Sequence, residues 1–207
     1  MAALIMNTDH YTKEGQTNLV DYGFIPGTES KLLLIKTGRG GNIYGYNNKY
    51  FRIAQHFNNV GYNVLCCSTP VELNDLENFQ TTFEIAKELL GEALGEISIS
   101  YIGFSRGAYQ GILYGSTIPQ IEGYLFINSP MTVNFHKQTK ALRGIDKRCM
   151  FVLGTKDPSY SLWELICQLK NPNIEFVEVS GADHQFKNMD EELFELPIKM
   201  FLTNKED

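Results

Sequence analysis

Short apolar runs alternate with stretches of helical periodicity along most of the chain. Residues 31–36 are typical of the apolar runs, because four aliphatic residues follow one another at 32–35 without a polar residue between them. Such continuous apolarity predicts a parallel strand that is buried on both faces of a sheet. Further strands of this kind are predicted at 63–68, 96–102, 122–128, 149–153 and 174–179. Residues 18–24 instead alternate in polarity before a Pro-Gly turn, which predicts an antiparallel strand in an edge hairpin.

The segments between these runs carry apolar residues at helical spacing. In residues 50–60, Tyr50, Ile53 and Phe57 fall on one face, and Gly61 follows where a helix is expected to end. Asn74 is placed to cap a second helix. Further helices are predicted after 106, within 131–148, at 159–170 and at 191–201. This alternation predicts an α/β protein, a three-layer α/β/α sandwich with a mostly parallel sheet, in one domain over residues 1–207.

The composition fits one globular domain and opposes several classes of partner. The chain has 207 residues, 43% of them hydrophobic, which is enough for one substantial core. The formal net charge of -6 opposes binding to nucleic acid or anionic lipid, since both require a surplus of Lys and Arg. The sequence carries neither an apolar run of the roughly 18 residues that a membrane span needs nor the features of a secretion signal. We therefore expect a cytoplasmic protein without a membrane partner, and its oligomeric state is open.

The four cysteines are not spaced as metal ligands. Cys66 and Cys67 are adjacent on an apolar run, whereas Cys149 and Cys167 lie far apart. Neither a Cys-x-x-Cys pair nor a cluster of Cys and His occurs in the sequence. The expectation is a set of reduced thiols and no metal site.

The sequence Gly-Phe-Ser-Arg-Gly at 103–107 is the strongest candidate for chemistry. It lies between the predicted strand at 96–102 and a helix that opens with small residues. A Gly-x-Ser-x-Gly turn in this setting exposes the serine hydroxyl at a helix N-terminus, because glycines allow the close backbone approach of so sharp a turn. The pattern alone also occurs in ordinary glycine-bounded turns. Its position between a strand and a helix favours Ser105 as a nucleophile.

A serine nucleophile needs a base that takes its proton and a carboxylate that orients the base. Of the four histidines, His184 lies just past the last predicted strand, and the others are His10, His56 and His136. Asp157 follows the predicted strand at 149–153 and precedes Pro158, so it is a candidate both for the acid and for a helix cap. The chain order Ser, Asp, His favours Asp157 over Asp183, which adjoins the histidine and would have to fold back to reach it.

An oxyanion hole requires two backbone N–H groups near the serine. Arg106 supplies the first, and the glycine-rich residues 37–41 follow the first parallel strand, where the second is expected, with the Arg39 N–H as candidate. Gly38, Gly40 and Phe104 are expected to line the substrate pocket. The glycine-rich residues match neither Gly-x-Gly-x-x-Gly nor the Walker lysine pattern, which opposes nucleotide binding. The side chains of Arg39 and Arg106 could attract an acidic acyl group or form surface salt bridges, and both interpretations are open.

At these residues the chain resembles the α/β-hydrolase superfamily, from about residue 31 through the terminal helix. The segments Gly-Thr-Lys-Asp-Pro at 154–158 and Gly-Ala-Asp-His at 181–184 are similar to the acid and base loops of small members related to dienelactone hydrolases and acyl esterases. The resemblance implies an eight-stranded design, with trimming at the N-terminus as an open option. It also implies a triad of Ser105, Asp157 and His184, with no metal or organic cofactor.

Two departures from the superfamily pattern carry structural expectations. Thr37-Gly38 stands where many relatives have His-Gly, so the support of the oxyanion loop must differ. Residues 128–149 are too few for the helical lid of larger relatives, which implies an open site without a cap domain and argues against lipase action on bulk lipid.

The resulting hypothesis is a serine hydrolase of the carboxylic ester hydrolase or thioesterase type. It would cleave an ester, thioester or lactone of a small or medium acyl substrate through an acyl-enzyme. Two alternatives stay open, an acyltransferase with the same triad and a non-catalytic binding protein of the same fold. The sequence leaves the acyl group, the leaving group and the pathway open.

Overall fold

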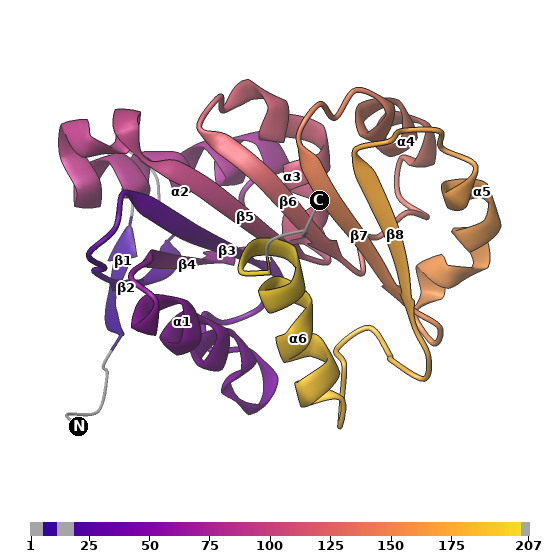
Figure 1. The fold of residues 1–207 in the computed structure, drawn as a ribbon, viewed down its shortest axis with the longest axis horizontal. Coiled ribbons are helices and arrows are strands. Elements are labelled where there is room, and N and C mark those ends of the chain that lie inside the picture. Colours follow the sequence, from indigo (N-terminus) through magenta and orange to yellow (C-terminus); the bar gives the residue numbers. More distant parts are fainter. Residues whose placement is uncertain (1–5, 12–18, 204–207) are drawn as a thin grey trace.

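The computed structural model describes residues 6–11 and 19–203, which form an eight-stranded sheet with helices on both faces (Figure 1). The strands are β1 (Asn7–Tyr11), β2 (Val20–Ile25), β3 (Lys31–Arg39), β4 (Asn63–Thr69), β5 (Ser98–Phe104), β6 (Ile121–Ile127), β7 (Arg148–Gly154) and β8 (Ile174–Val179). Their order in the sheet is β1-β2-β4-β3-β5-β6-β7-β8. The pairs from β4 through β8 are parallel, and the β1–β2 and β2–β4 pairs are antiparallel. The predicted mostly parallel α/β sheet is confirmed, and all eight strands of the expected design are present.

The helices cover the two faces of this sheet unequally. They are α1 (Lys49–Asn59), α2 (Asp75–Leu90), α3 (Arg106–Tyr114), α4 (Phe135–Arg143), α5 (Trp163–Cys167) and α6 (Asp190–Phe201). Short 3-10 helices occupy Tyr46–Asn48, Gly91–Glu96, Gly115–Thr117 and Pro158–Leu162. Helices α1 and α6 contribute to one core and lie in front of the sheet in Figure 1, whereas α2 to α5 contribute to the core on the other face. The three-layer prediction is therefore confirmed.

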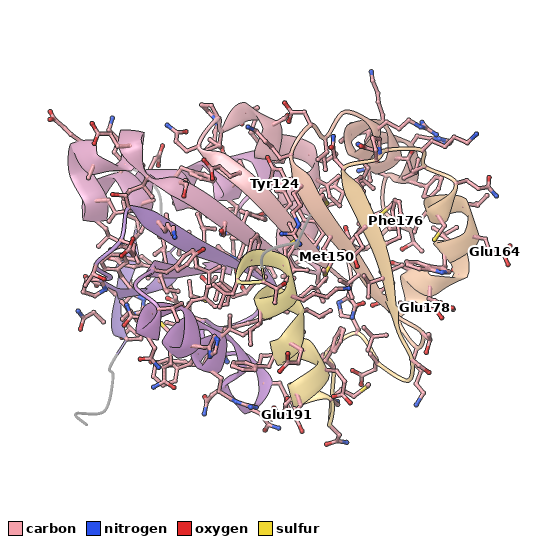
Figure 2. The ribbon with its side chains drawn as sticks, viewed as in Figure 1. Tyr124, Met150, Glu164, Phe176, Glu178 and Glu191 are labelled. Carbon is pink, nitrogen blue, oxygen red and sulfur yellow. The ribbon has the colours of Figure 1, made fainter. Side chains whose placement is uncertain are left out.

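Strand β3 explains why two cores form. Leu33 and Ile35 belong to the core beneath α1 and α6, while Leu32 and Leu34 belong to the opposite core, and all four are fully buried. Each such burial contributes roughly 1.5–3 kcal/mol. In Figure 2, Met150 of β7 lies near the middle of the molecule beside α6, whereas Glu178 of β8 and Glu164 of α5 lie at its right-hand side. The apolar centre fixes the strands whose ends carry the candidate site.

The predicted helix at 159–170 is wrong in type and length. The segment begins as the 3-10 helix Pro158–Leu162, and α5 ends at Cys167. The Asn171 side chain donates hydrogen bonds to the carbonyl oxygens of Leu142 and Ile145, at 2.8 and 2.9 Å. These contacts with a distant loop hold the chain out of a continued helix.

The antiparallel strand predicted at 18–24 is present as β2, and its antiparallel pair with β1 lies at one edge of the sheet, in line with the predicted edge hairpin. It pairs with β1 on one side and with β4 on the other, and β1 is the edge strand. Residue 18 lies outside the described residues. The sequence pattern did not indicate β1, because most of its side chains are exposed and its pairing depends on backbone hydrogen bonds.

Candidate active site

The candidate nucleophile lies on a sharp turn between β5 and α3. Ser105 has φ 49° and ψ -112°, a conformation that costs energy for a residue with a Cβ and that recurs at functional sites. Its amide donates to the Ile127 carbonyl oxygen at 2.8 Å, which ties the turn to the end of β6. A Cβ at Gly107 would lie 2.3 Å from the Lys36 carbonyl oxygen, and one at Gly103 would lie 2.6 Å from the Ala108 backbone. Only glycine fits both positions, so the motif is a packing requirement of this turn.

Three predicted residues meet at the carboxyl ends of β5, β7 and β8. The Ser105 Oγ is 2.8 Å from His184 Nε2, and His184 Nδ1 is 2.5 Å from Asp157 Oδ2. A carboxylate accepts only, so Nδ1 carries the ring proton and Nε2 accepts from the serine hydroxyl. The Asp157 side chain is 1% exposed and that of His184 is 43% exposed. The chain of hydrogen bonds thus runs from a buried acid to a base in contact with solvent.

The Asp157 carboxylate makes the contacts that both interpretations of this residue require. While Oδ2 faces His184, Oδ1 accepts the Ser159 N–H at 2.7 Å and caps the 3-10 helix that begins at Pro158. The cap fixes the orientation of the carboxylate before any substrate is present.

The side chain of Asp183, the alternative candidate for the acid, forms hydrogen bonds within its own loop. Its Oδ1 accepts the amides of Gln185 and Lys187, at 2.9 and 3.0 Å. The bond from the Lys187 amide is the largest cause that lowers the pKa of Asp183 below its usual value, so the carboxyl is ionised and shapes the histidine loop.

Asn128 is a supporting residue that the sequence reasoning missed. It follows β6, is 1% exposed and has φ 49°. Its Nδ2 donates to the carbonyl oxygens of Asp183 and His184, at 3.0 and 3.1 Å, and its Oδ1 accepts the Gly154 amide at 2.9 Å. The side chain therefore joins the end of β7 to the histidine loop. The available signal was a polar residue directly after an apolar strand, at the edge where ligands gather.

The two candidate oxyanion donors are the amide of Arg106, which directly follows Ser105, and the amide of Arg39, which follows Gly38 in the loop beside the serine. Arg106 is the first residue of α3, and an amide at that position has no partner inside the helix. In the glycine loop the Gly40 amide donates to Thr69 O at 2.7 Å and the Gly41 amide donates to Gly38 O at 2.9 Å. The amides of Gly40 and Gly41 thus donate hydrogen bonds within the protein. The Arg39 amide remains the candidate oxyanion donor of this loop.

The glycine-rich residues 37–41 lie directly against Ser105. A Cβ at Gly38 would be 3.3 Å from Ser105 Cβ and 3.8 Å from its Oγ. Thr37 Oγ1 lies 3.2 Å from the carbonyl oxygens of Gly38 and Gly41, to which it donates. This hydroxyl closes the turn from within, so the support of the loop comes from Thr37.

A cavity of about 580 Å³ opens above the serine. Gly38, Gly40 and Phe104 line it, as predicted, together with Ser105 and His184. Its other lining residues are Arg39, Gly41, Asn42, Gly45, Tyr46, Lys49, Tyr50, Ile127 and Gln185. Lys49 was not predicted, because nothing in the polar stretch before α1 shows that the helix starts at the cavity wall.

The two arginine side chains differ in their surroundings. Arg106 Nε donates to Asp75 Oδ1 at 2.6 Å, and a second bond joins its Nη2 to Asp75 Oδ2. This bidentate pair commits the Arg106 guanidinium to α2, in line with the salt-bridge interpretation. Arg39 is exposed, and its nearest hydrogen-bond partner is the Val71 carbonyl oxygen at 3.4 Å.

Residues 6–11 and 19–203 contain neither a cluster of metal ligands nor a membrane-spanning helix. Within these ranges, no three or more His, Cys, Asp or Glu side chains are grouped so that they could hold a metal ion. Nor does any helix there have the length and apolarity to cross a membrane.

No family model and no curated protein matches this chain. Solved structures do match it along most of its length. An α/β serine hydrolase homologue from Coxiella burnetii aligns with a TM-score of 0.71 at 18% identity, covering 95% of this chain and 99% of that one. An α/β serine hydrolase without lid from Xanthomonas campestris aligns with a TM-score of 0.69 at 13% identity, covering 93% and 92%. A dienelactone hydrolase from Anabaena variabilis aligns with a TM-score of 0.68 at 15% identity, covering 94% and 97%.

These likenesses show the fold. The chain has the α/β-hydrolase fold in its form without a cap domain, as predicted. The segment between β6 and β7 holds the nine-residue helix α4.

Proposed function

We propose that this protein is a serine hydrolase that cleaves an ester, thioester or lactone of a small or medium acyl group. The observation that carries the proposal is the hydrogen-bonded chain from Asp157 through His184 to the Ser105 hydroxyl, at the floor of an open cavity. Nucleophile, base and orienting acid in this geometry are the requirement for acyl transfer to serine. The solved structures of similar fold include serine hydrolases and a dienelactone hydrolase, which supports the same class of reaction.

The first half-reaction forms an acyl-enzyme. Ser105 Oγ attacks the substrate carbonyl carbon while His184 Nε2 takes the hydroxyl proton. The N–H groups of Arg106 and Arg39 stabilise the oxyanion of the tetrahedral intermediate, each contributing roughly a hundredfold to a thousandfold in rate. Asp157 stabilises the imidazolium and holds its orientation. His184 then donates the proton to the departing alcohol or thiol.

The second half-reaction releases the acid. Water attacks the acyl carbon, and His184 accepts its proton. As the second tetrahedral intermediate collapses, the C–O bond to Ser105 breaks and His184 returns the proton to Oγ, which restores the hydroxyl. The exposed His184 edge and the open cavity give water direct access. This access favours hydrolysis over transfer to another acceptor, and product analysis with competing alcohols, thiols and amines tests it.

A pair of carboxamide variants tests the assignment of the acid. With p-nitrophenyl acetate and butyrate, Asp157→Asn is expected to lower kcat by about ten-thousandfold, because the amide no longer selects the productive imidazole tautomer. Asp183→Asn keeps an oxygen that can accept the two loop amides, so its kcat is expected to stay close to that of the wild type. An equal loss in both variants would contradict the role of Asp157, and a folded wild type inactive on esters, thioesters and lactones would contradict the function.

A further inference from the structure

A second charged group, Lys49, lies in the wall of the catalytic cavity. It is the first residue of α1, is 9% exposed and lines the same cavity as Ser105 and His184. Its Nζ is 5.3 Å from the centre of the Tyr50 ring and 5.4 Å from that of Phe104, the residue before the nucleophile. The ammonium group therefore lies in the wall of the cavity that Ser105 also lines and not on the outer surface.

The Lys49 ammonium donates fewer hydrogen bonds to the described residues than it can. Nζ donates to the Gln185 carbonyl oxygen at 2.9 Å, whereas an ammonium carries three donors. Within residues 6–11 and 19–203, no carboxylate forms an ion pair with it. Burial lowers the pKa of Lys49 to about 8, against the opposing effects of Asp190 and Asp183. A desolvated cation in this state gains strongly from a bound anion.

The charges of the residues that line the cavity also favour a bound anion. The protein as a whole carries a formal net charge of -6, yet no Asp or Glu is among the described residues that line the cavity, whereas Arg39 and Lys49 are. A cation at the first position of a helix also opposes the helix dipole, and the first turn of α1 contains no acidic residue to offset it. The local helix therefore does not explain the lysine.

We propose that the substrate of this enzyme carries a carboxylate beside its scissile acyl bond and that Lys49 binds this carboxylate. The inference rests on the serine-hydrolase function proposed above and specifies its substrate class. One ammonium donor continues to hold the Gln185 carbonyl, and the others reach into the cavity toward the anion. Lys49 is thus a specificity-determining residue, and the acyl transfer itself proceeds at Ser105.

Matched pairs of esters test the proposal and locate the carboxylate. For the acyl half, p-nitrophenyl hydrogen esters of succinate, glutarate and adipate are compared with the corresponding methyl p-nitrophenyl diesters. For the leaving group, p-carboxyphenyl butyrate is compared with p-carbamoylphenyl butyrate. We expect kcat/KM for the anionic member of one pair to exceed that of its neutral partner by about tenfold to a hundredfold.

Variants assign this preference to one cation. Lys49→Met is expected to bring the ratio of anionic to neutral kcat/KM close to one, and Lys49→Arg to keep most of it. Lys187→Met, which removes an exposed lysine of the histidine loop, serves as the matched control and keeps the wild-type ratio. Arg39→Met tests the rival cation at the cavity. Loss of the preference in Arg39→Met with retention in Lys49→Met would overturn the proposal.

The pH dependence of the ratio gives a second signature. Lys49 is charged below its pKa and neutral above it, so the preference is present near neutral pH and is lost as the pH rises through about 8. Among the described residues, the other charged or titratable groups that act on Lys49 or line a cavity with it are Asp183, Asp190, His184, Arg39, Arg52, Tyr46 and Tyr50. His184 acts on both members of each pair and cancels in the ratio. Lys49→Arg keeps the preference at high pH, because the guanidinium stays charged.

The outcomes separate this inference from the proposed function. Hydrolysis of esters with an anionic-to-neutral ratio near one in every pair overturns the role of Lys49 and leaves the hydrolase function standing. If no ester is cleaved, calorimetric binding of the monomethyl adipate anion still tests the site. Binding by the wild type that is lost in Lys49→Met supports it, and equal binding or none overturns it.

Discussion

Two glycine-rich segments border Ser105, and they use glycine for different reasons. At the turn between β5 and α3, the space beside Gly103 and Gly107 is filled by backbone atoms of α3 and β3, 2.3–2.6 Å from where a Cβ would lie. In the loop after β3, a Cβ at Gly38 would instead point at the serine side chain, 3.3 Å away, and one at Gly40 would meet only a Val71 methyl group at 3.6 Å. The first segment has glycine because the fold leaves no room for a side chain. In the second segment, Gly40 has φ 65°, which favours glycine, and Gly38 leaves space beside the Ser105 side chain.

The two segments are therefore expected to affect different properties of the protein, the first its stability and the second its substrate specificity. The turn that holds Ser105 is fixed by packing, including a 2.7 Å hydrogen bond from the buried Tyr101 hydroxyl to the Gly107 carbonyl oxygen. The opposite wall, from the glycine loop to Lys49, passes through Gly45, Asn47 and Asn48, which all have positive φ. Changes in the turn are expected to affect folding, and changes in the opposite wall are expected to affect which substrates react.

Among changes in the two glycine-rich segments, Gly107→Ala is expected to have the largest effect on stability. The added methyl group would collide with the Lys36 carbonyl oxygen, so we expect a loss of about 3 kcal/mol in the free energy of unfolding. Gly95→Ala is the matched control, since nothing lies within 4 Å of its added Cβ. Urea denaturation measures both. An unchanged midpoint for Gly107→Ala would show that the turn is not held by backbone packing.

A smaller effect, on activity, is expected from Gly38→Ala. The methyl group would occupy space beside Ser105 Oγ, where the substrate carbonyl must lie. We expect kcat/KM on p-nitrophenyl esters to fall about tenfold, with an unchanged urea midpoint. A loss of stability without a loss of activity would remove the contrast between the two segments.

Most of the fold could be predicted from sequence, and the exceptions have a common cause. The buried strands could be predicted from apolar runs such as residues 32–35, since a strand covered on both faces excludes polar side chains. Strand β1 and the end of α5 could not be predicted. The first is stabilised by pairing with β2, and the second ends where Asn171 binds the loop after α4.

The residues of the candidate site also divide into those that could be predicted from sequence and those that could not. Ser105, Asp157 and His184 could be selected because each follows a predicted strand and their order fits the fold. Asn128 and Lys49 could not be selected, since their roles depend on contacts with residues far away in sequence, Gly154 for the first and Gln185 for the second. Residues defined by a local turn are visible in sequence, and those defined by tertiary contacts are not.

The most direct test of the central claim is covalent labelling with a fluorophosphonate, followed by mass spectrometry of the labelled peptide. An activated serine is predicted to give a single adduct on Ser105, absent in Ser105→Ala and formed much more slowly in His184→Ala. A folded wild-type protein that stays unlabelled, or a label that persists in Ser105→Ala, would contradict the assignment of Ser105 as the nucleophile.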